Sequence, residues 1–198
     1  MILHVIAVAF HRPLPLRILM ESFMVQTNPA WRLNIIHDGP SPESIKMLIN
    51  SPLYKDPRIF YTETDKVYGR WGHPNRKKGI SELPFNHHDF VLLTNDDNYY
   101  VPTFVQTMLR GCSDNSKIGF VYCNTVHNYQ NYDVLLTQLK RDHIDMGSFI
   151  VRVDIAKKVG FNNFEINADG IYAEQCSDLC RRLRLRINYV NKALFVHN

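Results

Sequence analysis

The chain has 198 residues, of which 45% are hydrophobic and 21% are charged, with 23 Lys and Arg against 19 Asp and Glu. This length and composition predict one ordinary globular domain with a well-buried core and exclude a disordered or fibrous protein. The net charge of +4 suits an anionic ligand but is too small to indicate a nucleic-acid partner.

The chain begins with an apolar run, Ile2 to Phe10, that has no basic region before it and no small-residue cleavage site after it. This run is too short to span a membrane, so it indicates a strand rather than a signal peptide or an anchor. None of the four cysteines, Cys112, Cys123, Cys176 and Cys180, forms a pair with zinc-finger spacing. We therefore expect free, mostly buried thiols and a cytoplasmic protein without a transmembrane segment.

Apolar runs alternate with helical periodicity through most of the chain, which predicts parallel βαβ units with right-handed crossovers. The expected strands are Ile2 to Phe10, Trp31 to Ile36, Arg58 to Thr62, Phe90 to Leu93, Ile118 to Cys123, Tyr132 to Leu139, Ser148 to Val153, Ile187 to Val190 and Ala193 to Val196. The expected helices are Arg17 to Gln26, one capped by Ser41 with Pro42 first, Asn75 to Leu83, Thr103 to Leu109, one capped by Asp154 and ending at Val159, and Ala168 to Leu185.

The rhythm of the pattern changes after Asn124, where the expected strands indicate a mixed or antiparallel extension of the sheet. The chain shows no internal repeat, low-complexity tract or linker. We therefore expect one α/β domain over 1–198, with a mostly parallel central sheet flanked by helices and with two halves, 1–98 and 99–198.

The central strand at Phe90 to Leu93 ends abruptly in four residues with oxygen-bearing side chains, Asn95, Asp96, Asp97 and Asn98. In an open α/β sheet, ligands collect beyond the carboxyl ends of the strands. Two adjacent carboxylates there repel each other unless a cation lies between them, and oxygen ligands suit Mg²⁺ or Mn²⁺. The stretch therefore predicts a metal–diphosphate site, with ordinary Asn/Asp turn chemistry as the alternative.

Three further side chains are candidates for the same site. Asp38 follows the second strand and could accept the imide N–H of uracil or bind ribose; an Asp-Gly turn is the alternative. Arg76 could pair with diphosphate oxygens, or lie on a solvated helix face. His197 follows the last strand and could bind Mn²⁺, or be exposed at the chain end.

The candidate general base is Asp169, which opens the last expected helix. Its carboxylate is either an N-cap or a base directed into a cleft. Glu174, further along the same helix, is the competing base. Neither the dinucleotide fingerprint G-x-G-x-x-G nor the phosphate loop ending in Gly-Lys-Ser/Thr occurs, so a nucleotide must be held by other means.

The order of these pieces resembles the GT-A glycosyltransferases of the large inverting family, glycosyltransferase family 2, which includes bacterial enzymes that build polysaccharides. The matching stretches are Ala9-Phe10-His11 after the first strand, His37-Asp38-Gly39-Pro40-Ser41 for Asp-Asp-Gly-Ser, Arg76-Lys77-Lys78-Gly79 for Arg-Asn-x-Gly, Asn95-Asp96-Asp97 for the Asp-x-Asp metal motif, His143 to Ser148 with Arg152 to Val159 for the acceptor side, Asp169 for the base, and His197 for the terminal histidine. The resemblance spans the whole chain and rests on order and spacing. Asn95 replaces the usual first Asp, and the common Glu-Asp pair near the base is absent.

The resemblance implies a GT-A, Rossmann-like domain that moves a sugar from a nucleotide-diphosphate donor, a UDP-sugar above all, to an acceptor hydroxyl with inversion. It implies Mn²⁺ or Mg²⁺ held by Asp97 and His197, with Asp96 on ribose or metal, Asp38 and Arg76 on the nucleotide, and Asp169 as base. The implied acceptor is a carbohydrate or glycolipid in polysaccharide or glycan synthesis.

Two other functions stay open on the sequence. One is a sugar-1-phosphate nucleotidyltransferase, which also has a doubly wound nucleotide-binding domain. Such an enzyme is expected to have a Gly-rich loop with Arg straight after the first strand, and His11 to Pro15 contains no glycine. A catalytically silent nucleotide- or carbohydrate-binding module is the other. The aromatic stretch Tyr129 to Tyr132 is a candidate sugar-stacking surface, or packs at a domain edge. Arg181 to Arg186 is a candidate for peripheral contact with anionic lipid, or a solvated helix end.

Overall fold

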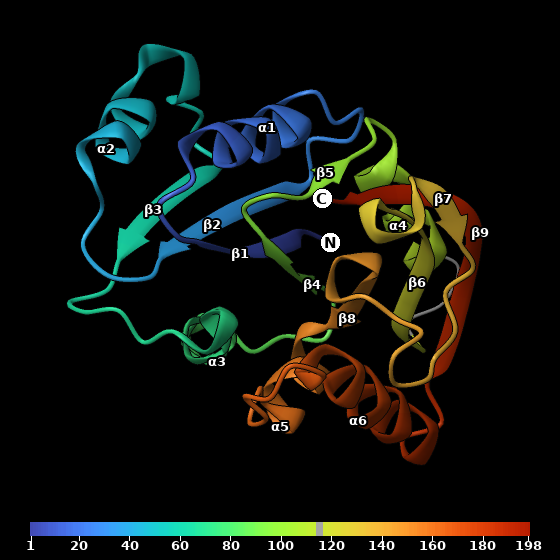
Figure 1. Cartoon of the computed structure of the whole chain (residues 1–198). Coiled ribbons are helices and arrows are strands. Elements are labelled where there is room, and N and C mark those ends of the chain that lie inside the picture. Colours follow the sequence, from blue (N-terminus) through green and yellow to red (C-terminus); the bar gives the residue numbers. More distant parts are fainter. Residues whose placement is uncertain (114–116) are drawn as a thin grey trace.

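The computed structural model describes residues 1–113 and 117–198, and Figure 1 shows its arrangement. The strands of these residues are β1 (Leu3–Ala9), β2 (Trp31–His37), β3 (Ile59–Glu63), β4 (Phe90–Asn95), β5 (Tyr99–Tyr100), β6 (Ile118–His127), β7 (Asp133–Leu135), β8 (Phe149–Arg152) and β9 (Arg186–His197). The α-helices are α1 (Pro13–Met24), α2 (Glu43–Asn50), α3 (His73–Glu82), α4 (Phe104–Ser113), α5 (Val153–Val159) and α6 (Ala168–Arg182).

The described strands form one nine-stranded sheet in the order β3-β2-β1-β4-β8-β6-β9-β5, with β7 added beside β6. The first four strands of this order are parallel, β8 runs antiparallel to both of its neighbours, and β9 is parallel to β6. Ala9 pairs with His37, and Val8 pairs with Asn95. The residues that follow β1, β2 and β4 therefore meet at one edge of the sheet.

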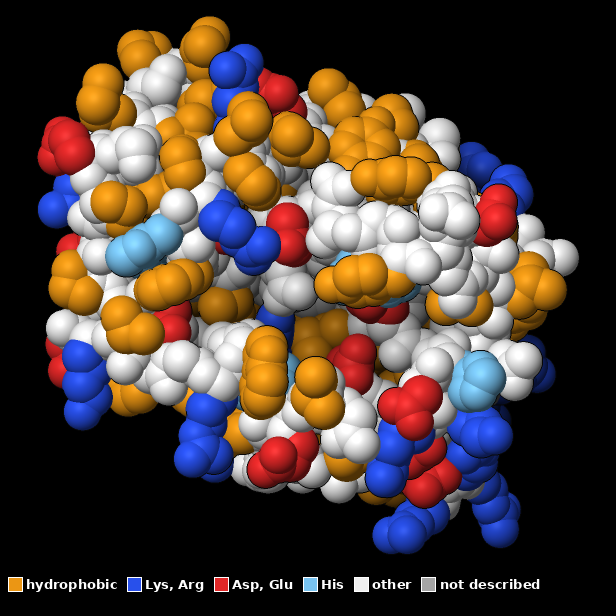
Figure 2. All heavy atoms as spheres, viewed as in Figure 1, with side chains coloured by type: hydrophobic (Ala, Val, Ile, Leu, Met, Phe, Trp, Pro, Cys, Tyr) orange, Lys and Arg blue, Asp and Glu red, His pale blue; other side chains and the backbone are white. Residues whose placement is uncertain are grey.

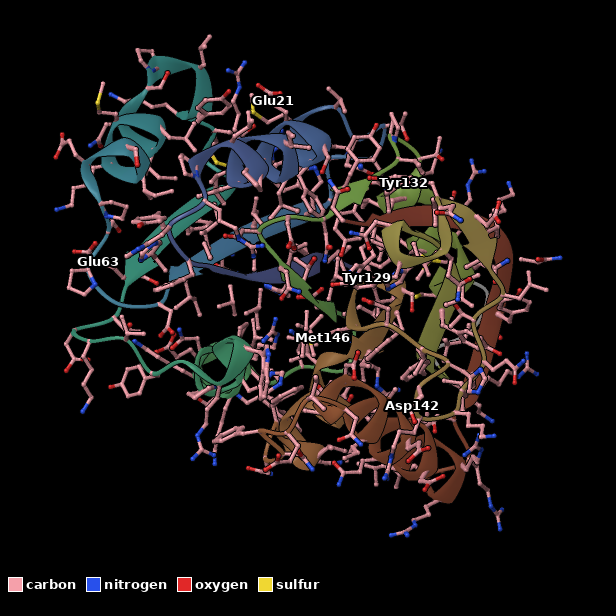
Figure 3. The ribbon with its side chains drawn as sticks, viewed as in Figure 1. Glu21, Glu63, Tyr129, Tyr132, Asp142 and Met146 are labelled. Carbon is pink, nitrogen blue, oxygen red and sulfur yellow. The ribbon has the colours of Figure 1, made fainter. Side chains whose placement is uncertain are left out.

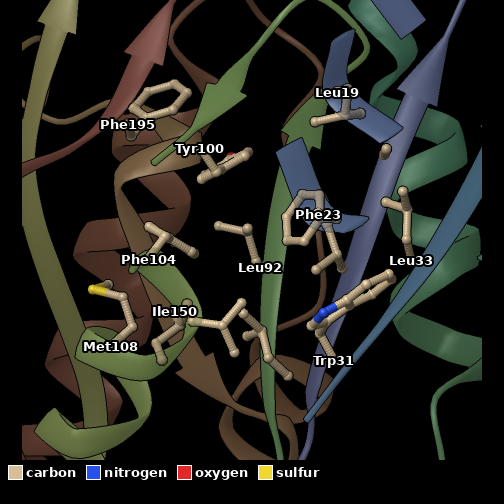
Figure 4. Packing of buried hydrophobic residues seen from close by; sticks show 14 of the residues in the cluster. Leu19, Phe23, Trp31, Leu33, Leu92, Tyr100, Phe104, Met108, Ile150 and Phe195 are labelled. Carbon is tan, nitrogen blue, oxygen red and sulfur yellow. The ribbon is translucent and has the colours of Figure 1, made fainter. Parts of the chain in front are cut away.

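Both faces of the sheet are covered by helices. Successive side chains of β1 point to opposite faces of the sheet, and both sets are buried. Val5 and Ala7 belong to one buried cluster, whereas Ile6 belongs to the other. The first cluster packs under α1 and α4 and includes the aromatic side chains drawn in Figure 4, which are Phe23, Trp31, Tyr100, Phe104 and Phe195. The second packs beneath α3, α5 and α6 and includes the side chains of Phe120, Phe149, Phe161 and Tyr172. This double cover explains the continuous apolar runs of the central strands.

Two of the expected helix caps are wrong. Helix α2 begins at Glu43, and the hydroxyl of Ser41 donates instead to Glu63 Oε2 at 2.6 Å. Asp154 lies within the first turn of α5, where its carboxylate accepts a hydrogen bond from Arg152 Nε at 2.5 Å. In both cases the side chain bonds another side chain and not a backbone N–H of the helix N-terminus.

Two strand predictions also need correction. The last two expected strands form one continuous strand, β9, whose pairing with β6 contains irregularities near Cys123 and Asn124 that absorb the break in the apolar pattern. The strand expected over Tyr132 to Leu139 is reduced to β7, because it pairs with β6 over three residues only.

All four cysteines are free and buried. No helix in the described part of the chain is long and apolar enough to cross a membrane.

Candidate active site

Two cavities lie side by side at the carboxyl edge of the sheet, and Figure 2 shows this hollowed face with acidic side chains between hydrophobic ones. The first cavity, of about 350 Å³, is lined by Arg12, Asp38 and Asp97 among others. The second, of about 370 Å³, is lined by Arg76, Asp145 and Asp169 among others. Both cavities share four lining residues: Trp71, Asn95, Tyr129 and His197. The two spaces are therefore contiguous.

The two carboxylates that follow β4, the acidic pair of Asp96 and Asp97, are paired with the cationic side chain of Arg12. Asp96 is 0% exposed, and its Oδ2 accepts the backbone N–H of Phe10 at 3.0 Å. The guanidinium of Arg12 donates to Oδ1 of Asp96 and, at 2.5 Å, to Oδ2 of Asp97. Burial raises the pKa of Asp96 to about 6 despite the opposing charge of Arg12. The sequence interpretation did not include Arg12 in the site, although it follows the first strand directly.

Asp38 lies at the floor of the first cavity, but most of its hydrogen-bonding capacity is taken by a neighbouring loop. Oδ1 accepts the backbone N–H of Tyr68 at 3.0 Å and the side-chain amide of Asn75 at 3.0 Å. Oδ2 accepts the backbone N–H of Gly69 at 2.8 Å. An ionised carboxylate has about four lone-pair sites, so roughly one remains for a ligand. Asp38 thus shapes the loop that borders the cavity.

Arg76 is 2% exposed, so its interpretation as a solvated helix side chain is wrong. Its Nη1 donates to the carbonyl of Trp71 at 2.5 Å and lies 3.1 Å from Nδ1 of His73, and its Nη2 donates to Oδ1 of Asn95. Burial lowers the pKa of Arg76 to about 10, which leaves the side chain charged at neutral pH. The buried guanidinium therefore lines the second cavity and bonds Trp71 and Asn95, two residues that line both cavities.

His197 lies in a cluster of its own at the junction of the cavities. Its Nδ1 is 2.7 Å from Oδ2 of Asp145, and its ring stacks on His127 with centroids 4.2 Å apart. These three residues each offer a ligand atom within 4.8 Å of the others. His197 is only 18% exposed, so the alternative of an exposed terminal histidine is wrong. His127 and Asp145 were absent from the predicted site; Asp145 lay within the acceptor-side motif, but its role was unassigned.

The junction contains donor groups of the kind that bind a divalent cation. The ligand atoms of His127, Asp145 and His197 lie close together, and Asp97 is outside that cluster. Oδ1 of Asp97 is buried and has no hydrogen-bond partner in the described part of the chain. Asp97 and His197 both line the first cavity. A carboxylate oxygen and an imidazole nitrogen are suitable ligands for Mn²⁺ and less suitable for Mg²⁺, which prefers oxygen. Residues 100 positions apart in the sequence therefore offer donors to one space.

Asp169 lies in the first turn of α6, whose N-cap is Asn167, so the interpretation of Asp169 as the cap is wrong. Burial and the nearby charge of Asp145 raise the pKa of Asp169 to about 6. Glu174 is placed differently: its carboxylate accepts the backbone N–H of Arg141 at 2.8 Å, and it lines neither cavity. The structure thus directs Asp169, but not Glu174, into the second cavity.

No protein-family model matches the chain, and no curated protein matches it in sequence. Solved structures do match it. Residues 1–349 of TarS from S. aureus superimpose with a TM-score of 0.76 over 100% of this chain and 60% of that one, at 12% identity. The fold is that of the GT-A glycosyltransferases. The predicted fold class is confirmed.

Ligand-bound neighbours have the same fold. The complex of TarS 1–349 with UDP-GlcNAc has a TM-score of 0.75 at 12% identity, over 100% of this chain and 58% of that one. The mannosyltransferase PcManGT from Pyrobaculum calidifontis, in complex with GDP-Man and Mn²⁺, has a TM-score of 0.69 at 11% identity, over 98% of this chain and 56% of that one. The chain spans less than two thirds of the length of these neighbours.

Proposed function

We propose that this chain is a metal-dependent, inverting glycosyltransferase that moves a sugar from a UDP-sugar to the hydroxyl of a carbohydrate or glycolipid acceptor. One observation carries the proposal. The two cavities meet at a junction, with the acidic pair on one side and Asp169 on the other. A transferase needs this order: a leaving-group site, a transferred sugar, and an acceptor hydroxyl beside a base. The related folds that hold UDP-GlcNAc and GDP-Man support it.

The first cavity would hold the nucleotide diphosphate. Asp38 would accept the imide N–H of uracil with its remaining lone pair, while Arg12 would move from the carboxylates to the phosphate oxygens. Asp97 and His197 would hold a divalent cation, which supplies positive charge to the departing diphosphate. Asp96, which is buried beside them, would position the turn after β1 through its hydrogen bond with the backbone N–H of Phe10.

The second cavity would hold the acceptor. Asp169 would accept the proton of the attacking hydroxyl, and its raised pKa makes it a stronger base than an ordinary aspartate. Arg76 lies buried beneath this space and stabilises the ionised form of Asp169. A base on the side of the sugar away from the diphosphate gives direct displacement, and hence inversion at the anomeric carbon.

The decisive experiment combines binding and turnover. UDP binding is measured by calorimetry with and without Mn²⁺, and UDP release is followed for a panel of UDP-sugars and, for comparison, GDP-mannose. We expect UDP binding that depends on Mn²⁺, and slow UDP release from at least one UDP-sugar without added acceptor. Asp97→Asn should abolish the Mn²⁺ dependence, whereas the exposed Asp133→Asn should behave as wild type.

Two outcomes would replace the proposal. Mn²⁺-dependent UDP binding without release from any nucleotide sugar, even with a panel of oligosaccharide acceptors, would indicate a silent binding module. Release of pyrophosphate from UTP in the presence of a sugar 1-phosphate would indicate a nucleotidyltransferase. Product stereochemistry, read by NMR from the anomeric coupling constant, tests inversion separately from transfer.

A further inference from the structure

The connection between β3 and α3 contains four consecutive residues in the left-handed region. Their φ angles are 65° at Gly69, 51° at Arg70, 54° at Trp71 and 76° at Gly72. Glycine adopts this conformation freely, but Arg70 and Trp71 carry a Cβ and are strained there. Strained backbone persists only where the surrounding structure over-determines it, and it concentrates at functional sites.

Three sets of contacts hold this turn in place. The carboxylate of Asp38 accepts the backbone N–H of Gly69, just before the strained pair. The buried guanidinium of Arg76 donates to the carbonyl of Trp71, the second residue of the strained pair. Gly72 lies against β1 so closely that an added Cβ would lie 2.3 Å from Cγ1 of Val8. Two of the predicted nucleotide-binding residues, Asp38 and Arg76, therefore fix the backbone of Trp71.

The result is an indole held out of the core, beside the place where the cavities join. Trp71 is 62% exposed and lines both cavities. Tyr129, labelled in Figure 3, is 82% exposed and also lines both. It comes from the turn after β6, a different part of the chain. By contrast, the only other tryptophan, Trp31, is 1% exposed and packs in the core.

The chemistry around these aromatic rings is mixed. The junction also presents the polar side chains of Asn95 and His197, with Asp169 in the adjoining cavity. Sites for small molecules combine apolar surface with a few polar groups that fix orientation. A pyranose ring has a C–H face, which packs on an aromatic ring, and a rim of hydroxyl groups, which needs polar partners. A purely apolar ligand would leave the polar groups at this junction unpaired.

We propose that Trp71, assisted by Tyr129, is the stacking platform for a pyranose ring at the junction of the cavities. The inference rests on the proposed function, because the ring belongs to the donor or to the acceptor. In either case the strained turn orients the indole before the sugar binds. This pre-organisation reduces the entropy lost on binding.

The two tryptophans make a direct optical test possible. Acrylamide should quench the fluorescence of Trp71 and leave that of Trp31 nearly untouched, because Trp31 is buried. With Mn²⁺ and UDP present, a panel of methyl pyranosides should lower the quenching constant at least threefold below that with UDP alone. UDP-GlcNAc and UDP-glucose test the donor ring in the same way. Protection in either arm supports the proposal and identifies the source of the ring.

Variants separate stacking from folding. Trp71→Ala should weaken binding of the protecting sugar at least tenfold and leave UDP affinity within twofold, whereas Trp71→Phe should retain most of the sugar affinity. Tyr129→Ala should weaken sugar binding by about threefold or more. Tyr132→Ala should leave sugar binding unchanged, because Tyr132 is exposed and lines neither cavity. The Trp71 variants are read by calorimetry, because they lack the fluorescent reporter. The Tyr129 and Tyr132 variants keep Trp71 and can also be read by quenching.

Two results would overturn the proposal. One is quenching of Trp71 that no sugar in either arm changes beyond the effect of UDP. The other is a Trp71→Ala variant that loses UDP affinity as strongly as sugar affinity, which would make the indole part of the nucleotide pocket. Absence of UDP binding would instead count against the proposed function. In that case the quenching constant of Trp71, measured with methyl pyranosides alone, would still test sugar stacking.

Discussion

His197 Nδ1 lies 2.7 Å from Oδ2 of Asp145, which joins the last residue of β9 to the turn before β8. Burial by itself would raise the pKa of Asp145, but the adjoining imidazole outweighs it and holds that pKa below its usual value. Because Asp145 is bound in this way, it fixes the ring of His197, the proposed metal ligand. Partners of metal-binding histidines commonly have this orienting role.

We predict that Asp145→Asn weakens Mn²⁺ binding by about 10–100-fold, the usual effect of removing the partner of a histidine ligand. Electron paramagnetic resonance of free Mn²⁺ measures the affinity without any turnover. The exposed Asp142→Asn, three residues away, should bind Mn²⁺ as the wild type does. Equal Mn²⁺ affinity in both variants would mean that Asp145 does not act on the metal site.

Asp169→Asn should lower turnover by roughly 10²–10⁴-fold, as expected for the loss of a general base. UDP affinity should stay within about twofold, because Asp169 lines the second cavity and not the first. The matched variant is Glu174→Gln, whose carboxylate binds Arg141 outside both cavities. Steady-state kinetics with the best donor distinguishes them. A larger loss in Glu174→Gln would transfer the role of base to that residue.

Asp169 should also make the stability of the protein depend on pH. The pKa of Asp169 is about 6 in the folded protein against an ordinary 3.8, so the folded state keeps this proton longer than the unfolded state. Stability therefore falls as pH rises from about 4 to 6, and the penalty is complete above 6. At pH 7 Asp169→Asn should raise the free energy of unfolding by about 1–3 kcal/mol, an amount limited by the size of the pKa difference.

Urea unfolding without metal at pH 4 and pH 7 measures this effect. The protonated carboxyl at pH 4 resembles the amide of asparagine, so the two proteins should then be nearly equal in stability. A variant that is stabilised equally at both pH values would contradict the raised pKa. The exposed Asp133→Asn should show no gain at either pH.

Gly147→Ala tests how the core positions the metal ligand. A Cβ at Gly147 would lie 2.4 Å from Cζ of Phe195, a fully buried residue two positions before His197. Overpacking of this kind costs about 1–3 kcal/mol. We expect a lower Tm together with weaker Mn²⁺ binding, since Phe195 must move. Adding Phe195→Leu should restore part of both; a double variant that recovers neither would exclude this steric explanation.

Arg12→Gln should separate metal binding from nucleotide binding. The guanidinium of Arg12 occupies both carboxylates of the acidic pair and competes with a cation there. Its removal should tighten binding of Mn²⁺ alone and weaken UDP binding at saturating Mn²⁺, each by about tenfold, or 1.4 kcal/mol. Arg17→Gln, a control that removes an exposed pair with Glu21 far from the acidic pair in the sequence, should change neither. Calorimetry that shows both affinities falling together would contradict the competition.

The local pattern of the sequence determined the α/β alternation and the edge at which ligands are expected. Asp38, Asp96 and Asp97 follow parallel strands, and the carboxyl ends of neighbouring parallel strands share one edge of the sheet. Their convergence could therefore be predicted from strand order alone. The polar run after β4 and the terminal histidine stood out because each ends an apolar segment abruptly.

Only the tertiary structure decided which other groups join them. Arg76 is buried, Arg12 reaches the acidic pair, and Asp145 meets His197, because segments far apart in the chain pack together at this edge. The left-handed conformation of Trp71 is equally invisible in the sequence, since a residue with a Cβ adopts it only when surrounding contacts compensate the strain. Local propensity acts over a few residues, whereas these placements depend on long-range packing.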